Sequence, residues 1–235
     1  MRFEKVRLYI STPRIGRYLQ ATGNSKPKAI RLYKANLKVS QAFLPIIAVL
    51  EVTIRNRINT ILTGYFSDPD WIINQKNGFM IDPSLTHRDK RTGKMIMNRY
   101  LKGEVERAEK KIQKSGTAPT SGKIISEQTF GFWTDLYEVH HYKILLGRPI
   151  QIFTNLPAAH GRKDVNDALN KIRLFRNRLY HNEPICFNGP NKDFQNADDI
   201  HKLVLEVLSW VDPELIKWIR NIDSVQKQIA SGKKI

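Results

Sequence analysis

Residues 47–61 read IAVLEVTIRNRINTI, and they decide the class of the fold. Their large apolar side chains recur at spacings of three and four residues: Ile47, Leu50, Ile54, Ile58 and Ile61. At 100° per residue these positions fall within about 80° of arc, which is one face of an amphipathic helix. Residues 166–181 show the same period, and no repeat or clear hairpin signal appears elsewhere. The sequence therefore predicts an all-α fold, a helical bundle.

Further segments are predicted to be helical or irregular from their periodicity and their turn residues. The predicted helices cover 95–113, 124–146, 197–211 and 213–221, and the predicted loops cover 76–95 and 114–122. We predict a single domain over 1–235. Within it we expect a basic, loop-rich insertion over 74–122 and a flexible tail over 223–235.

Composition limits the class of protein. Of the 235 residues 41% are hydrophobic, which is enough for a packed core and too many for a largely disordered chain. The apolar uncharged stretch 39–50 has only 12 residues, whereas a membrane span needs about 20, so no transmembrane helix is expected. The start of the chain lacks a signal-peptide core. The single cysteine, Cys186, excludes an internal disulfide and a cysteine-rich zinc site. We expect a soluble cytoplasmic protein with no membrane partner.

Positive charge is concentrated in two blocks. The chain has 39 Lys and Arg against 22 Asp and Glu, a net charge of +17. Residues 1–38 hold ten Lys and Arg against Glu4 alone, and residues 86–123 hold eleven against four acids. Such blocks concentrate polyanions, of which nucleic acid is the commonest in a cell. Charge alone does not separate RNA from DNA, and a solvated face that keeps the protein soluble is the alternative.

Arg176 is the unusual residue of the predicted helix over 166–181. The apolar stripe of this helix consists of Val165, Ala168, Ile172, Phe175 and Leu179. Arg176 lies against that stripe, where a guanidinium is costly unless it is paired. Glu51 and Arg55 lie at the edge of the apolar face formed by 47–61. If the two faces pack together, Glu51 meets Arg176, either as a plain ion pair or to orient Arg176 for a phosphate.

His181 follows Arg176 by five residues, about 140° round an ideal helix, so the two side chains do not share a face. Asn177, one turn before His181, does share its face. Three arrangements stay open: the helix loosens before Pro184 and His181 swings toward Arg176, the two residues act on different sides, or a dimer brings two histidines into one cleft. A capping or solvent-exposed histidine is the remaining alternative.

No other pattern points strongly to chemistry. His140 and His141 are adjacent, whereas two helical ligands of one metal need a spacing of i and i+4. Asp135 and Glu138 nearby could add oxygens, but their aromatic surroundings favour packing, so we expect no metal site and no cofactor. A phosphate-binding GxxxxGK[ST] loop and a G-x-S-x-G nucleophile turn are both absent from the sequence.

Four stretches, in order along the chain, resemble one family. The last and most specific is 172–185, IRLFRNRLYHNEPI. The earlier ones are 9–19 (YISTPRIGRYL), 32–37 (LYKANL) followed by 50–56 (LEVTIRN), and 130–133 (FGFW). Together they resemble the Abi-like, AbiD/AbiF-type abortive-infection proteins of the HEPN superfamily of α-helical RNases. The resemblance covers 9–220, and 76–122 is its least diagnostic part.

The resemblance implies a metal-independent endoribonuclease. The superfamily signature is an Arg, four to six residues and a His, usually with a polar residue after the Arg, and Arg176, Asn177 and His181 match it position by position. It implies that Arg176 and His181 are catalytic and that Asn177 supports them. Glu51, with Arg55 beside it, is our candidate for orienting Arg176. The candidate RNA contacts are Arg173, Arg178, Lys90, Arg91 and Lys94.

The resemblance also implies partners and a biological role. HEPN RNases generally act as homodimers with a composite cleft, on tRNA, rRNA or a phage transcript. Phage defence or a toxin role is implied, with a protein or RNA antitoxin as a restraint. Many relatives read His-His-Glu-Pro where this chain has His181-Asn182-Glu183-Pro184. The alternative is a catalytically silent module that binds RNA or protein. DNA binding would need a helix-turn-helix that we do not find.

Overall fold

The computed structural model describes residues 2–235, and it is helical over 69% of them and strand over 4%. The predicted all-α class is therefore confirmed. The helices are α1 (Phe3–Ile10), α2 (Thr12–Ala21), α3 (Lys26–Phe66), α4 (Trp71–Asn74), α5 (Tyr100–Lys114), α6 (Ser121–Glu127), α7 (Phe130–Asp135), α8 (Val139–Ile144), α9 (Arg162–Tyr180), α10 (Gln195–Val211), α11 (Glu214–Ile219) and α12 (Val225–Lys233). The short 3-10 helices are η1 (Gln75–Asn77), η2 (Phe79–Ile81), η3 (Pro83–Leu85) and η4 (Arg148–Ile152). Two antiparallel hairpins, β1–β2 (Thr86–Arg88 and Met95–Met97) and β3–β4 (Phe187–Asn188 and Asn191–Lys192), complete the fold.

The described chain divides into two compact units. Unit 1 runs up to Leu50 and also contains Lys171–Ser209 and Pro213–Ile235, and unit 2 contains Glu51–Asn170 and Trp210–Asp212. Both boundaries in α3 and α9 fall inside a continuous helix. The prediction of a single domain over 1–235 stays a prediction.

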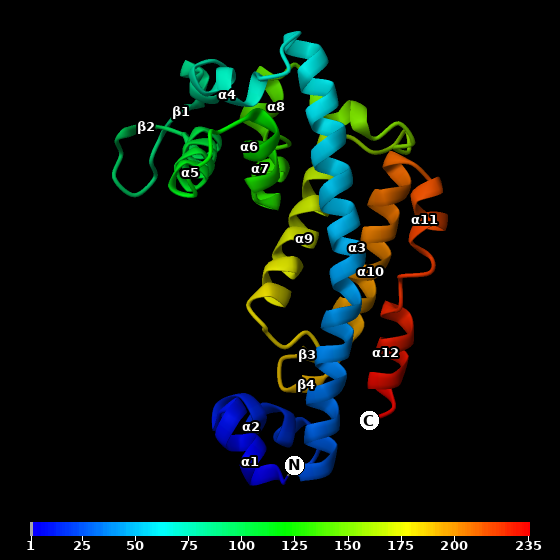
Figure 1. Cartoon of the computed structure of the whole chain (residues 1–235). Helices are drawn as coiled ribbons and strands as arrows, with labels where there is room; N and C mark the ends of the chain where they lie inside the picture. Colours follow the sequence, from blue (N-terminus) through cyan, green and yellow to red (C-terminus); the bar gives the residue numbers. More distant parts are fainter. Residues whose placement is uncertain (1) are drawn as a thin grey trace. The chain divides into compact units, whose positions relative to one another are not determined.

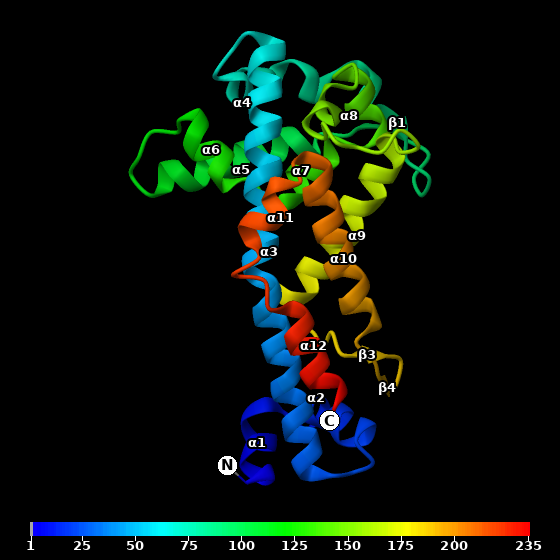
Figure 2. The same cartoon turned by 90° about the vertical axis from the view of Figure 1, so that its right-hand side faces the viewer.

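The core of unit 1 forms around the first half of α3. In Figures 1 and 2, α10 and α12 run alongside this half of α3, and the end of α9 lies on another side of it. Phe43 of α3 is fully buried, its ring centroid lies 4.8 Å from that of Phe175 on α9, and it also contacts the ring of His201 on α10. Aromatic and branched side chains at helical spacing thus join three helices in one core.

The last residues of the chain form a packed helix instead of the predicted flexible tail. Val225 and Ile229 of α12 lie one turn apart and are 0% and 1% exposed. Gly232, one turn further, lies so close to the ring of Phe194 that a Cβ there would be 2.6 Å from Cζ. The prediction over 223–235 missed α12 because only a few apolar positions among charged and polar residues carry its buried face.

A hydrogen-bond chain fixes α12 to α10. Gln226 Nε2 donates to Oδ1 of Asp198 over 2.6 Å and lies 3.0 Å from Nδ1 of His201. Nε2 of His201 lies 2.7 Å from Oδ2 of Asp223. A carboxylate only accepts, so Asp198 turns the amide nitrogen of Gln226 toward His201, and Nδ1 must accept. The other nitrogen of this buried ring, Nε2, then donates to Oδ2 of Asp223.

Unit 2 has its own core, built around the second half of α3. Phe66 at the end of α3 stacks on Trp71 of α4 and on Phe79 of η2, with ring centroids 6.3 and 5.8 Å apart. α5 and α6 contact one another, and α5 also contacts α7. Phe132 and Trp133 of α7 are buried. The aromatic motif over 130–133 is therefore part of this core.

The secondary structure of residues 74–146 differs from the prediction in two places. Residues 76–95 contain more regular structure than predicted, and the helix predicted over 124–146 is interrupted. The predicted loop contains the hairpin β1–β2, which pairs His87 with Ile96, and α5 begins at Tyr100. The single helix predicted over 124–146 is three short helices, because Gln128 and Glu138 have extended backbone conformations. Apolar periodicity continues across these breaks, which is why the pattern hid them.

α3 is long and apolar enough to cross a membrane by length and composition, with an 18-residue window of mean hydropathy 1.7. One such helix is weak evidence for a membrane span, because the core helix of a soluble protein passes the same test. Of this window 39% is buried within the protein. The prediction of a soluble protein stays a prediction.

Candidate functional site

α9 ends in a turn that fixes the backbone around His181. The N–H of Asn182 donates to the carbonyl of Leu179 over 3.0 Å, and that of Glu183 donates to Arg178 over 2.8 Å. Asn182 has a φ of 54°, in the left-handed region. These features define a Schellman motif, in which His181 is the C-cap residue and Asn182 the left-handed residue after it. Asn adopts this conformation more readily than most residues, which gives a structural reason for Asn182.

The helix does not loosen before His181. The N–H of His181 donates to the carbonyl of Asn177 over 2.9 Å, the ordinary bond of an α-helix. His181 therefore stays on the face of Asn177 and about 140° from Arg176. The swing of His181 toward Arg176 is not observed. Two of the open arrangements remain, action on different sides and a cleft shared between two copies.

The guanidinium of Arg176 lies over a neighbouring ring. Its central carbon is 4.0 Å from the ring centroid of Tyr180, one turn further along α9, and Nη1 donates to Oδ1 of Asn177 over a long 3.5 Å. Arg176 is half-buried, whereas His181 is exposed. The contact with the ring restrains the guanidinium, whose planar fork suits two-pronged recognition of a phosphate.

The loop after His181 is held by groups from α3 and α9. Arg178 donates from Nη2 to the carbonyl of Pro184 over 2.5 Å, and its Nε lies 3.3 Å from the carboxylate of Glu183. The N–H of Ile185 donates to Oδ1 of Asn36 over 2.8 Å, and Asn36 is only 3% exposed. Arg178, a predicted RNA contact, thus stabilises the turn beside His181.

Two arginines of α2 reach the same segment, and the sequence analysis missed both. Arg14 donates from Nη2 to the carbonyl of Asn182 over 2.6 Å. Arg17 donates to the carbonyl of Gly189 over 2.8 Å and lies over the ring of Phe187 at 4.4 Å. These contacts join residues about 170 positions apart, so local spacing contains no signal for them. The only hint was that α2 belongs to the basic block over 1–38.

A buried thiol lies behind this segment. Cys186 is fully buried, and burial raises the pKa of its thiol from the ordinary 9.0 to about 12. Burial also raises the pKa of the Tyr18 hydroxyl. The thiol therefore stays protonated at neutral pH, and it offers neither a nucleophile nor a metal ligand.

Glu51 and Arg55, the candidates for orienting Arg176, lie in the part of α3 that belongs to unit 2. Both are half-buried, and Nε of Arg55 donates to Oδ1 of Asn56 over 3.4 Å. Arg173 and Arg176 belong to unit 1. The predicted meeting of Glu51 and Arg176 stays a prediction.

The remaining candidate RNA contacts, Lys90, Arg91 and Lys94, lie in the turn of the hairpin β1–β2. All three are exposed, and this hairpin projects from unit 2 (Figure 1). Asp89 accepts from the N–H and the hydroxyl of Thr92, both over 2.6 Å, which closes the turn and lowers the pKa of that carboxyl. The one acid of the turn is therefore occupied, and the basic side chains face solvent.

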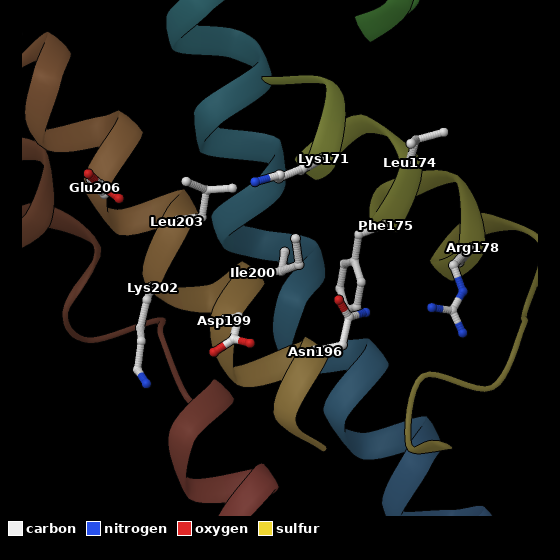
Figure 3. A pocket seen from close by; sticks show the side chains of 10 residues that line it. All are labelled: Lys171, Leu174, Phe175, Arg178, Asn196, Asp199, Ile200, Lys202, Leu203 and Glu206. Atoms are coloured by element: carbon white, nitrogen blue, oxygen red, sulfur yellow. The ribbon is translucent and has the colours of Figure 1, made fainter. Parts of the chain in front are cut away.

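A groove of about 600 Å³ runs between α9 and α10 in unit 1 (Figure 3). Leu174, Phe175, Ile200 and Leu203 give it an apolar floor, and charged side chains of both signs form its rim. Leu174 is 58% exposed. The groove begins on the same helix as Arg176, but its mixed rim charges do not define a phosphate site.

The described residues, 2–235, contain no group of three or more His, Cys, Asp or Glu side chains that could hold a metal ion. His141 is 1% exposed, and its Nδ1 lies 2.8 Å from Oδ2 of Asp135. The orientation of the His141 ring does not allow a hydrogen bond to Asp135. Both ring nitrogens of His141 therefore have no hydrogen-bond partner among residues 2–235. Of the possible ligands, only His141 and Asp135 thus lie together within unit 2, and His140 is exposed.

Comparisons of the chain with protein-family models, with curated proteins and with solved structures gave no match.

Proposed function

We propose that this protein is a metal-independent endoribonuclease of the HEPN type. One observation carries the proposal: α9 ends at an exposed His181 in a firmly held turn, and Arg176, on the preceding turn, lies over the ring of Tyr180. The sequence resemblance to Abi-like proteins and the net charge of +17 support it. RNA would be held through its phosphates by the basic blocks, including Lys90, Arg91 and Lys94.

The chemistry suits these residue types. The 2′-OH of the RNA attacks the adjacent phosphorus, a P–O bond forms, and the bond from phosphorus to the 5′ oxygen breaks. The products are a 2′,3′-cyclic phosphate and a 5′-OH. An imidazole titrates near neutral pH, so His181 would take the proton of the 2′-OH. Arg176 would stabilise the charge on the phosphorane oxygens.

A second proton must reach the leaving 5′ oxygen. One imidazole does not easily serve as base and acid in the same step. The separation of about 140° between Arg176 and His181 also keeps the two from meeting on one chain. A homodimer answers both points, since it brings a second His181 and a second Arg176 into a composite cleft. We therefore include the homodimer in the proposal.

The cellular role follows from this activity. An enzyme that cuts tRNA, rRNA or a phage transcript stops translation, which fits phage defence or a toxin. Such an activity needs a restraint, either an infection signal or an antitoxin of protein or RNA. We propose a cytoplasmic location, because the substrate is there.

The test is cleavage of total tRNA and rRNA by the purified protein, with and without EDTA. We expect EDTA-resistant cutting that leaves 2′,3′-cyclic phosphate ends. His181→Ala and Arg176→Ala should each lower the rate by a factor on the order of 10²–10⁴. The matched controls His140→Ala and Arg220→Ala remove an exposed histidine and an exposed arginine elsewhere. Cutting that survives both site substitutions would overturn the assignment.

One observation favours a second candidate, a catalytically silent module that binds RNA or protein. Arg178 is engaged in the turn, and Arg176 and His181 point to different sides of α9. A purely structural α9 end would have the same features. In that case wild type and both site variants would bind RNA equally, and none would cut it under any condition.

A further inference from the structure

Arg14 contacts the backbone directly beside the proposed base. Its Nη2 donates to the carbonyl of Asn182, the residue after His181, over 2.6 Å. No other hydrogen bond, ion pair or ring contact involves this guanidinium within residues 2–235. Arg14 is half-buried, and its backbone belongs to the regular helix α2.

The Asn182 carbonyl is a sensitive point of the turn. Asn182 is the left-handed residue of the Schellman motif, and the backbone reverses direction there. The groups on its far side, Pro184 and Ile185, are already bonded to Arg178 and Asn36. The bond from Arg14 holds the carbonyl of Asn182, which lies between His181 and the residues bonded to Arg178 and Asn36.

The position of the His181 side chain depends on this bond more than the position of a packed core side chain would. Its side chain is exposed, so packing does not set its orientation. Its position follows from its own backbone, which ends a helix and enters the turn. Misplacement of a reacting group by 1 Å can lower a rate by about 100-fold. A charged donor at the carboxyl end of a helix is also favoured by the helix dipole.

We propose that Arg14 is a positioning residue for His181, acting through the Asn182 carbonyl. This inference rests on the proposed ribonuclease function for its effect on rate. The contact itself predicts a link between Arg14 and the His181 ring whether or not the protein cuts RNA.

Arg17 supplies a matched control on the same helix. It also donates to a backbone carbonyl, that of Gly189, over 2.8 Å, but eight residues beyond His181. Arg14→Met and Arg17→Met each remove one positive charge and one guanidinium–carbonyl bond from α2, and Arg17→Met also removes the contact with the ring of Phe187. Any effect of charge on RNA binding is therefore common to both variants, and a difference between them reports position.

The experiment measures kcat and KM for RNA cutting, and the His181 ring signals in 1H–13C NMR spectra without RNA. We expect Arg14→Met to lower kcat at least tenfold, whereas its KM should equal that of Arg17→Met. Arg14→Met should also shift or broaden the His181 signals. Arg17→Met should leave these signals as in wild type. Arg14→Lys, which keeps a charged donor, should recover part of kcat. Circular dichroism and thermal melting confirm that the variants fold.

Two outcomes overturn the proposal. One is a set of His181 signals that is the same in Arg14→Met as in wild type. The other is an equal fall of kcat in both methionine variants. If the wild-type protein cuts no RNA while the NMR result still separates the two variants, the ribonuclease function fails and the link from Arg14 to His181 stands.

Discussion

His181 and Asn182 show how one backbone conformation sets the end of α9. Asn182 has a φ of 54°, where a β-branched side chain clashes with its own backbone and glycine does not. We expect Asn182→Val to lower the free energy of unfolding by about 1–2 kcal/mol. Asn182→Gly should leave it within about 0.5 kcal/mol. Urea unfolding of both variants checks this, and an equal loss in the two would contradict the assigned turn.

The buried thiol of Cys186 predicts a dependence on alkaline pH. Burial raises the pKa of this thiol from 9.0 to about 12, so the folded protein keeps a proton that the unfolded chain loses earlier. Its contribution to stability is full below pH 9 and is lost as the pH rises toward 12. We expect no alkylation of the native protein by iodoacetamide at pH 8 and complete alkylation in urea. Rapid native alkylation would contradict the burial.

At the level of the site, the sequence predicted part of the arrangement and not the rest. Helical spacing placed Asn177 with His181 and put Arg176 about 140° away, because these are properties of one helix. The contacts of Arg14 and Asn36 with the turn were not predictable. They join distant segments, and no local pattern indicates which carbonyl an arginine from another helix will meet.

Two helical glycines of unit 1 give opposite predictions at the level of the element. At Gly232 of α12 a Cβ would lie 2.6 Å from the fully buried ring of Phe194, which cannot move aside. We expect Gly232→Ala to cost about 1–3 kcal/mol of stability by overpacking. At Gly16 of α2 nothing lies within 4 Å. Gly16→Ala should therefore stabilise by about 0.5–1 kcal/mol.

Urea unfolding of the two alanine variants measures this difference within one unit. A stabilising effect of Gly232→Ala would show that α12 does not pack on Phe194. The result also bears on the chain end, which the sequence assigned to a flexible tail.

Long periodic helices were the predictable elements. α9 and α10 were expected within four and two residues of their observed starts, at 166 against Arg162 and 197 against Gln195. The sequence predicted α3 only over its most apolar part, because the first half of α3 carries many lysines and arginines on its exposed side. The breaks between α6, α7 and α8 were missed because the apolar pattern continues through them.

For the whole molecule, we predict an RNA affinity that depends on salt and to which the hairpin turn contributes. Each phosphate contact with single-stranded RNA adds about 0.7 to the slope of log K against log salt. Replacing Lys90, Arg91 and Lys94 by glutamine should therefore reduce the slope by about 2. The control replaces Lys227, Lys233 and Lys234 by glutamine, which removes the same charge from the C-terminal end. Equal effects of the two triple variants would show that only net charge matters.

The central claim is that His181 activates the 2′-OH of RNA. The most direct measurement is the single-turnover rate of wild type and His181→Ala on one RNA, with either a 2′-OH or a 2′-O-methyl group at the cut site. We predict that wild type cuts only the RNA with the free 2′-OH, and that His181→Ala lowers this rate by a factor on the order of 10²–10⁴. Cutting of the methylated RNA, or an undiminished rate in His181→Ala, would contradict it.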